Sequence, residues 1–401
     1  MKKLLFIINT LGCGGAERAI LNLFSALDSN KYEISLFVLT SQGELRRELP
    51  ENVRLINKKY KEVSVLTKKG RRLLTLSVLK AGIGKALFLR RAPYIIKNFL
   101  IMRKKGKIMP DKLLWRLLSD GAPKIQEEYD LAVAYLEGGA TYYVADYVKA
   151  KKKAAFVHID YEKAGYTREL DLDCYEKFDR IFTVSDEVKE HFLRVYPEYE
   201  CKTSVFNNIL NLERIKKMAD QGEGFNDGFK GLRILTVGRL TRQKRYDVAI
   251  NAMKLMKEKI GVPIRWYVLG EGDLRQELEQ QIKSAGLEND FILMGVKENP
   301  YPYYKGCDFY VHATEFEGKS IALQEAQVLG KPILATDCSG NREQIENGTD
   351  GILCELDPGQ VCEKLLYMIN NPEKCKGYGE KAKQKELCNT KGFDEFIAMA
   401  E

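Results

Sequence analysis

The sequence has few of the residues that build metal sites and membrane spans. It holds three histidines among 401 residues, and no two of its nine cysteines form a Cys-x-x-Cys pair. A zinc site is therefore not expected, and this odd, irregular set of cysteines fits reduced thiols in a cytosol. No window approaches the roughly 18 uninterrupted apolar residues of a transmembrane helix. The apolar run Leu4–Ile8 is too short for a signal peptide and is expected to be a first β-strand.

Positive charge is concentrated in one segment. The chain carries a net charge of +8, but residues 58–112 contain 17 Lys and Arg against Glu62 and Asp111, a net of +15, so the remainder is acidic at −7. Apolar residues are interleaved with these cations. The basicity is a local feature and needs a local explanation.

Short apolar runs alternate with helical patterns in two series. Such alternation predicts βαβ units and parallel sheets. The first series of expected strands is Leu4–Ile8, Ile34–Leu39, Leu131–Tyr135, Lys153–Val157 and Arg180–Val184. The second is Leu232–Val237, Arg265–Leu269, Phe291–Met294, Phe309–His312, Pro332–Ala335 and Gly351–Cys354.

The two series predict an α/β protein of two doubly wound, Rossmann-like domains facing each other across a cleft. We expect a first domain at 1–220 with a basic helical insertion at about 58–125, a linker at 221–230 rich in Gly, Asn and Asp, and a second domain at 231–401. The last residues are able to pack back on the first domain. Ligands bind such sheets outside the carboxyl ends of the strands.

Three motifs follow expected strand ends. In the first, Gly14 and Gly15 precede a helix, where glycines let the backbone approach a ligand and the helix start favours an anion. A dinucleotide fingerprint would need glycine where Glu17 stands, so a dehydrogenase is disfavoured, and a plain tight turn stays open. In the second motif, Arg239 and Lys244 leave the first strand of the second series and suit a diphosphate.

The third motif, residues 315–326, is the most specific. Glu317 and Glu325 stand eight positions apart, and Gly318, Lys319 and Ser320 lie between a strand end and an apolar helix. Amides at this helix start can meet a phosphate, and a carboxylate further along can accept bonds from ribose hydroxyls. Without the glycine and the following Gly330-Lys331-Pro332, a surface helix with two glutamates would explain the pattern equally well.

In these motifs the chain resembles the group 1 family of retaining glycosyltransferases (glycosyltransferase family 4). This family has the GT-B fold and includes bacterial surface-polysaccharide enzymes. The matching stretches are Gly14–Arg18, Leu269–Asp273, Gly295-Val296, Tyr303-Tyr304, Asp308, Glu317–Ala326, Thr336–Gly340 and Glu343. The match is weak between about 58 and 125. Lys319-Ser320 replaces the aromatic or proline-containing pair common after Glu-Gly, so the resemblance does not identify the donor sugar.

The resemblance implies a role for each motif residue. Arg239 and Lys244 would bind the donor diphosphate, Glu317 would lie beside the transferred sugar, and Glu325 would hold the ribose. The resemblance also implies donor contacts from Lys319, Ser320 and Ile321 through their amides, from Gly295 and Val296 near the base, and from Gly14 and Gly15 over the phosphates. His158 would face the reacting sugar, although a structural role is equally open for a lone histidine after a strand.

These roles predict a retaining hexosyltransferase that uses a nucleoside diphosphate sugar, UDP rather than GDP, with no cofactor and no metal. Asp171 and Asp173 form an Asp-x-Asp pair, but they stand in a polar, helical pattern and not after a strand, which disfavours a metal–nucleotide role. No placed nucleophile emerges, which favours departure and attack on one face of the sugar. A sugar-nucleotide epimerase of the same fold and a non-catalytic sugar-nucleotide-binding partner of another transferase are the alternatives.

The basic segment 58–112 predicts contact with an anionic membrane surface. We expect a saccharide or lipid-linked saccharide acceptor, a role in cell-surface polysaccharide synthesis, and a cytoplasmic, peripheral location at the inner face of the membrane. A helical insertion that packs its Leu and Ile into the first domain is the alternative. Nucleic acid is not an expected partner, because the segment has few aromatics and no recognised nucleic-acid module surrounds it.

Overall fold

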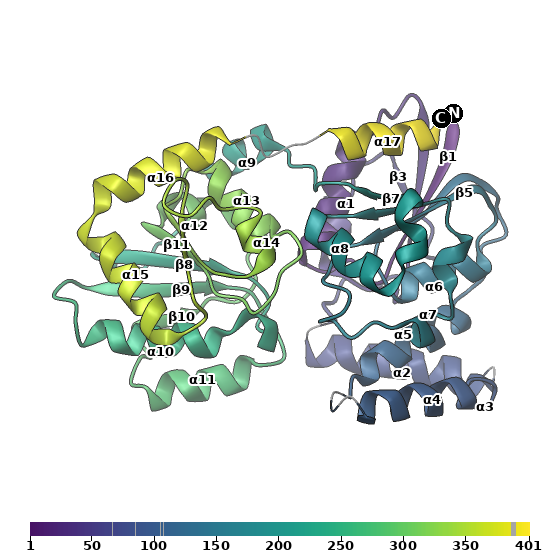
Figure 1. Cartoon of the computed structure of the whole chain (residues 1–401), viewed down its shortest axis with the longest axis horizontal. Helices are drawn as coiled ribbons and strands as arrows, with labels where there is room; N and C mark the ends of the chain where they lie inside the picture. Colours follow the sequence, from purple (N-terminus) through teal and green to yellow (C-terminus); the bar gives the residue numbers. More distant parts are fainter. Residues whose placement is uncertain (66, 85, 105, 107, 386–389) are drawn as a thin grey trace. The chain divides into compact units, whose positions relative to one another are not determined.

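The computed structural model forms two compact units, which Figure 1 shows with their elements labelled. The first comprises Met1–Ile209 and Cys388–Glu401, and the second Leu210–Leu387. Residues 66, 85, 105, 107 and 386–389 lie outside the described part of the chain, as do the side chains of 68, 80–84 and 111. In the described part, no helix is both long enough and apolar enough to cross a membrane.

The first unit is built on a parallel sheet in the order β3-β2-β1-β4-β5-β6-β7. Its strands are β1 Lys2–Ile8, β2 Tyr32–Val38, β3 Val53–Leu55, β4 Tyr129–Ala134, β5 Ala150–Val157, β6 Arg180–Thr183 and β7 Thr203–Val205. The central strands are buried on both faces, as continuous apolar runs require, and every residue from Leu4 to Ile8 has no exposed surface.

The second unit repeats the same winding order in a parallel sheet, β10-β9-β8-β11-β12-β13. Its strands are β8 Leu232–Val237, β9 Ile264–Leu269, β10 Phe291–Leu293, β11 Phe309–His312, β12 Ile333–Thr336 and β13 Ile352–Cys354. In each sheet the direction of winding reverses beside the first strand, between β1 and β4 and between β8 and β11. Such reversal points open a crevice at the carboxyl ends of the strands.

The predicted α/β fold with two doubly wound sheets is confirmed, and each expected strand is present within one to three residues at either end. The sequence did not predict β3 and β7. Both have three residues and lie at the edges of their sheet, where a short apolar run leaves little periodic pattern.

Helices cover the first sheet, and four of them occupy the basic segment. Helices α1 Gly15–Ala26, α6 Gly139–Tyr147, α7 Arg168–Asp171 and α8 Asp186–Val195 connect the strands. Helices α2 Lys68–Gly84, α3 Leu87–Arg90, α4 Ala92–Lys104 and α5 Pro110–Gly121 form the insertion. The insertion contacts the rest of the unit mainly through α5, which packs on α6, and α4, which packs on α7 (Figure 1).

The helices of the second unit surround its sheet. They are α9 Leu212–Ala219, α10 Tyr246–Lys257, α11 Arg275–Ser284, α12 Tyr301–Gly306, α13 Ile321–Val328, α14 Ser339–Arg342, α15 Pro358–Asn370 and α16 Pro372–Gln384. Helix α13 begins within the third motif, nine residues after the end of β11, so the first part of the motif forms the loop at the carboxyl end of that strand.

The last helix, α17 Lys391–Ala400, belongs to the first unit (Figure 1). Its Phe396 is fully buried, with ring centroids 6.2 Å from Phe6, 6.1 Å from Phe156 and 6.0 Å from Phe182. Lys152 Nζ also donates a hydrogen bond to the Met399 carbonyl at 2.9 Å. These last residues therefore complete the core of the unit that the first residues begin.

The boundary between the units differs from the expected one. The segment expected as a linker, 221–230, is part of the second unit: Phe225 lies 4.5 Å from the Tyr267 ring, and Asp227 pairs with Arg233 and Arg265. Gly and Asn in this stretch indicated a loop correctly but gave no sign of these aromatic and ionic contacts.

Candidate active site

The reversal point of the second sheet brings two predicted motifs together. Lys244 ends a 3-10 turn, Arg242–Lys244, that follows β8, and Glu317 follows the adjacent strand β11. Lys244 Nζ donates a hydrogen bond to Glu317 Oε2. Both side chains are largely buried, at 14% and 15% exposed.

Glu317 is held as a carboxylate. Burial acts to raise its pKa, but the Lys244 ammonium and a hydrogen bond with His312 outweigh burial and lower the pKa to about 2. His312 Nε2 lies 3.2 Å from Glu317 Oε2. The pair is thus a fixed negative charge and a fixed positive charge at one edge of the sheet.

Backbone contacts fix the two loops that carry the pair. Gln243, beside Lys244, donates from Nε2 to the Phe316 carbonyl at 2.7 Å, and its own carbonyl accepts from the Glu315 amide at 2.9 Å. Gly340 lies so close to the loop of Glu317 that a Cβ at position 340 would stand 2.5 Å from the Glu317 carbonyl oxygen. The loops are therefore clamped from two sides, and Gly340 is needed for the close approach.

Arg239 is an exposed cation at this edge, two residues after the end of β8. Its side chain forms no hydrogen bond or ion pair with the residues that the structure describes. A guanidinium without such a partner is available to an anionic ligand.

The start of α13 lies beside the pair. Ser320 is the N-cap, and its hydroxyl accepts from the Leu323 amide at 3.3 Å. Lys319 is half-buried and Ile321 is buried, and both flank this cap. Because the side chain of Ser320 serves the helix itself, the contribution expected of 319–321 to a ligand would come from backbone amides.

Glu325 is more enclosed than its expected ribose role suggests. It is 4% exposed, and its two carboxylate oxygens accept from the hydroxyls of Tyr301 at 2.9 Å and Tyr304 at 3.1 Å. The tyrosines therefore orient this carboxylate, which the sequence did not predict.

Gly295 and Val296 follow β10. Gly295 has φ +73° and pairs with Gly270 in an isolated antiparallel bridge, which suits glycine because of its left-handed backbone. Val296 is 41% exposed. An exposed aliphatic side chain at a strand end is available to a flat ligand.

In the first unit, Gly14 and Gly15 lie at the start of α1, where the Glu17 carboxylate is also found. A Cβ at Gly14 would stand 2.2 Å from Glu17 Oε2, whereas one at Gly15 would meet nothing within 4 Å. Glu17 Oε1 accepts from the Thr10 hydroxyl at 2.8 Å. The helix start thus already faces one carboxylate, and a phosphate bound there would require Glu17 to turn aside.

His158 follows β5 and is half-buried. Its amide donates to Glu137 Oε2 at 3.0 Å, and its Nε2 is buried with no hydrogen-bond partner among the described residues. Burial lowers the pKa of His158 to about 3, so the ring is neutral near pH 7. A neutral imidazole with one unsatisfied nitrogen is able to bond a ligand hydroxyl.

Asp171 and Asp173 do not form a pair. Asp171 is fully buried and accepts from the hydroxyls of three tyrosines: Tyr142 at 2.9 Å, Tyr161 at 2.6 Å and Tyr196 at 2.7 Å. Asp173 is 63% exposed and lies 3.8 Å from an Arg168 nitrogen. The tyrosine cage explains the buried carboxylate without a metal.

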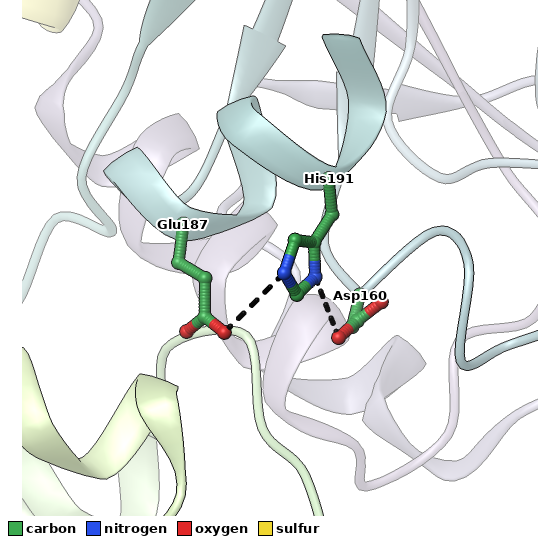
Figure 2. Close-up of side chains that lie close together, drawn as sticks. All are labelled: Asp160, Glu187 and His191. Carbon is green, nitrogen blue, oxygen red and sulfur yellow. Dashed lines mark ion pairs between the residues drawn. The ribbon is translucent and has the colours of Figure 1, made fainter. Parts of the chain in front are cut away.

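A group of three potential metal ligands, Asp160, Glu187 and His191, lies in the first unit. Figure 2 shows the two carboxylates facing opposite nitrogens of the ring: His191 Nδ1 lies 2.6 Å from Asp160, and Nε2 lies 3.8 Å from Glu187. The Lys163 ammonium is also 3.3 Å from Asp160. One ring nitrogen of His191 and one oxygen of each acid lie within 4.8 Å of one another, and the Lys163 ammonium beside Asp160 already balances part of their negative charge. The predicted independence from metal stays a prediction.

Comparison with known proteins decides the family. The model of the family described as "Glycosyl transferases group 1" matches residues 225–385, which is most of the second unit. Residues 225–385 therefore belong to the group 1 glycosyltransferase family. Relatives that align with nearly the whole chain extend the comparison to the first unit.

Relatives of this glycosyltransferase include enzymes that act on lipid-linked saccharides. It is 27% identical over 98% of its length, and 96% of the relative's, to the N-acetylgalactosamine-N,N'-diacetylbacillosaminyl-diphospho-undecaprenol 4-alpha-N-acetylgalactosaminyltransferase of Campylobacter jejuni. It is also 27% identical to the UDP-Gal:alpha-D-GlcNAc-diphosphoundecaprenol alpha-1,3-galactosyltransferase of Escherichia coli, over 44% of the chain and 48% of the relative.

Solved structures share the fold of the whole glycosyltransferase. Anabaena HepE in complex with UDP and glucose aligns with a TM-score of 0.68 at 16% identity, covering 99% of this chain and 98% of that one. An S. aureus TarM variant, in a complex that contains UDP, aligns with a TM-score of 0.68 at 12% identity over 100% of both chains. The glycosyltransferase therefore has the predicted GT-B fold.

Proposed function

We propose that the protein transfers a sugar from a nucleoside diphosphate sugar, a UDP-sugar rather than a GDP-sugar, to a saccharide acceptor with retention of anomeric configuration. The observation that carries the proposal is the buried Lys244–Glu317 pair at the reversal point of the second sheet, beside exposed Arg239. The family, and the UDP bound to both structural relatives, support this reading.

The residues of this edge suit the charges that develop during transfer. Breaking the glycosyl–phosphate bond places negative charge on the diphosphate and positive character on the sugar. Arg239 and Lys244 would stabilise the departing diphosphate together with amides at the start of α13, and Glu317 would face the positive sugar. Cations that are already in place near that charge need no metal to assist them.

His158 is the residue of the first unit that we propose for a sugar hydroxyl. As a neutral ring with a buried, unsatisfied Nε2, it offers a hydrogen bond and not a charge. Retention fits an acceptor that attacks from the face the diphosphate leaves.

A panel of sugar nucleotides tests the donor class. A ligand at 100 times its dissociation constant adds about 2.7 kcal/mol of stability, so a UDP-sugar should raise the melting temperature while Lys244→Ala abolishes the rise. Stabilisation by guanosine nucleotides alone would overturn the donor assignment. With donor and acceptor in hand, the anomeric proton coupling of the product reports retention or inversion.

We further propose that the acceptor is a lipid-linked saccharide, on the route to a cell-surface polysaccharide. Both relatives named above carry a diphospho-undecaprenol substrate in their names. Under α4 lies a cavity of about 450 Å³. Its lining combines apolar side chains, including Ile101, Met102 and Leu170, with polar and charged ones, including Asn98, Arg168 and Glu169, so it could accommodate a chain that has both hydrocarbon and polar parts.

The outer face of α4, made of Ile96, Phe99, Leu100 and Arg103, would dock the enzyme on the cytoplasmic membrane. The three apolar side chains are 58%, 41% and 56% exposed, while Tyr94 on the opposite face is buried. The spacing of 3 and 4 residues places all four on one side of the helix. Such a face can enter the headgroup region while its cations meet anionic lipid.

The insertion packs some of its apolar side chains into the first unit, as the alternative interpretation expects, but leaves others exposed. Val78, Leu87, Tyr94 and Met102 do pack inward. The large apolar side chains that remain exposed on the insertion are Leu76, Leu79, Leu89, Ile96, Phe99, Leu100 and Ile108. The predicted docking segment 58–112 also includes 66, 85, 105 and 107, which lie outside the described residues.

Flotation with vesicles of anionic lipid tests the docking. Wild type should float at low salt and sink as salt screens the charges. The triple change Lys97→Glu, Arg103→Glu and Lys104→Glu should abolish flotation. A matched triple change on exposed cations of α16 in the second unit, Lys374→Glu, Lys376→Glu and Lys381→Glu, should not. Equal loss in both would mean that only net charge matters, and a wild type that stays in solution would end the membrane proposal.

A further inference from the structure

One buried side chain touches the Lys244–Glu317 pair from behind. His312, the last residue of β11, is 1% exposed. Its Nε2 lies 3.2 Å from Glu317 Oε2 and 3.4 Å from Lys244 Nζ, and its Nδ1 lies 3.3 Å from the Tyr310 hydroxyl. All four side chains belong to the second unit, so this geometry does not depend on any other part of the chain.

The neighbours of the ring determine where its proton lies. The Lys244 ammonium can only donate, and the Glu317 carboxylate can only accept. Since Lys244 already donates to Glu317 directly, a proton on His312 Nε2 gives the carboxylate a second donor, and Nδ1 is then free to accept from the Tyr310 hydroxyl. In the opposite tautomer Nε2 would accept from the Lys244 ammonium at 3.4 Å and Nδ1 would donate to the Tyr310 hydroxyl, but Nε2 and Glu317 Oε2 would then face each other 3.2 Å apart with no proton between them.

The two oxygens of Glu317 are therefore unequal. Oε2 accepts from Lys244 and faces His312, while Oε1 has no hydrogen-bond partner among the residues that the structure describes. The inequality matters because only an oxygen without a partner offers its full acceptor capacity to a substrate.

We propose that His312 is a positioning residue, which as a neutral Nε2–H donor anchors Oε2 of Glu317 and thereby presents Oε1 to the donor sugar. This inference rests on the proposed glycosyl transfer at the Lys244–Glu317 pair. Burial and the Lys244 charge both lower the pKa of His312, in keeping with a neutral ring. Tyr310 supports His312 in turn, because its hydroxyl donates to Nδ1 and so fixes the tautomer of the ring.

The aromatic side chains behind His312 continue toward the second glutamate. The Tyr310 ring lies 5.3 Å from the Tyr304 ring, and the Tyr304 hydroxyl lies 3.1 Å from Glu325 Oε2. Tyr301 holds the other oxygen of Glu325 at 2.9 Å. Both glutamates of the third motif are thus oriented from one buried layer.

Three substitutions at two positions separate positioning from folding. His312→Leu fills the space but removes the hydrogen-bond donor to Glu317. His312→Gln restores an N–H donor at a similar distance from Glu317. Tyr310→Phe removes the hydroxyl that fixes the tautomer of His312. Tyr267→Phe is the matched control, because it also removes a buried tyrosine hydroxyl, one that donates to Asp227 away from the pair.

A misplaced catalytic group costs up to roughly 100-fold in rate, so we expect His312→Leu to lower kcat by about 10- to 100-fold. UDP affinity should change by less than about twofold, because the nucleotide does not contact Glu317 Oε1 in this scheme. His312→Gln should recover most of the rate, Tyr310→Phe should have an intermediate rate, and Tyr267→Phe should match wild type. A full rate in His312→Leu, or parallel losses of rate, UDP affinity and melting temperature, would overturn the proposal.

A second measurement does not need turnover. In protein labelled with ¹³C at glutamate carboxyls, the Glu317 signal, assigned with Glu317→Gln, reports the pKa of that carboxyl. His312→Leu should raise this pKa, because a donor is lost while burial remains, and Tyr267→Phe should leave it in place. An unchanged pKa in His312→Leu would overturn the anchoring of Oε2. A wild type that processes no nucleotide sugar, together with a raised Glu317 pKa in His312→Leu, would count against the proposed function and leave the anchoring of Oε2 in place.

Discussion

Replacing Asp171 by asparagine should change how the stability of the first unit depends on pH. Asp171 accepts three tyrosine hydroxyls inside the cage described above, and Arg116 donates to its carbonyl at 2.9 Å. Burial raises the pKa of its carboxyl from 3.8 to about 6, although the tyrosine bonds and Arg116 oppose the rise. An asparagine side chain at this position would keep a carbonyl oxygen for two of the tyrosines and lose the titrating proton.

The sign follows from which state binds the proton more tightly. The folded carboxyl has the higher pKa, so folding takes up a proton between pH 3.8 and about 6, and stability falls as pH rises through that window. The difference between the folded and unfolded pKa values corresponds to a loss of about 3 kcal/mol of unfolding free energy at high pH. Roughly half of this loss develops between pH 5 and 7.5. Well below pH 3.8 the carboxyl is protonated in both the folded and the unfolded chain, so its titration no longer lowers stability.

Urea unfolding at pH 5 and pH 7.5 measures the effect. The two tryptophans, Trp115 and Trp266, lie in different units, so a Trp266→Phe background lets Trp115 fluorescence report the first unit alone. In that background, the stability difference between Asp171→Asn and wild type should move by roughly 1 to 2 kcal/mol in favour of asparagine as pH rises from 5 to 7.5. Asp173→Asn, two residues away and exposed, is the control and should show no such movement.

A pH-independent difference between Asp171→Asn and wild type would refute the reasoning, because the buried carboxyl would then titrate as in the unfolded chain. A difference that moves in favour of aspartate at higher pH would mean that Arg116 and the tyrosines outweigh burial.

Three further predictions concern the active site. Arg239→Ala and Lys244→Ala should each lower kcat/KM by the equivalent of about 1.5–3 kcal/mol, the range for hydrogen bonds to charged groups. The control Lys257→Ala, on α10, should leave kcat/KM unchanged. Unchanged kinetics in the first two variants would remove both residues from the diphosphate site. Glu325→Gln should weaken UDP binding in calorimetry, while Glu317→Gln should bind UDP like wild type and transfer slowly; wild-type UDP binding by both would contradict the ribose role of Glu325. Turnover should persist in excess chelator, and an activity that returns only with added magnesium or manganese would contradict metal independence.

The fold could be predicted from the sequence because buried parallel strands are continuous apolar runs. Leu4–Ile8 and Phe309–His312 are examples whose bounds agree closely with β1 and β11. The edge strands β3 and β7 were missed because three residues form no readable period. The assignment of residues 210–220 to the second unit also could not be predicted, because it depends on packing of α9 against α12 and α13.

The motif residues of the site were predicted, but their supporting residues were not. Lys244 and Glu317 stand at strand ends, so their approach follows from the winding order of the sheet. His312, Tyr310 and Tyr301 show no motif in the sequence, because what matters is which side chain faces which across the core. One available signal was that His312 ends a buried strand five residues before Glu317, where a polar residue needs a partner.

The placement of α17 has a consequence for biosynthesis. Domains generally fold as units while the chain leaves the ribosome, the N-terminal one first. Here residues 1–209 emerge early, but the aromatic cluster around Phe6, Phe156 and Phe182 stays open until Phe396 arrives, after the whole second unit has been translated. The unit begun first is therefore finished last, and its apolar core stays incomplete until the end of synthesis.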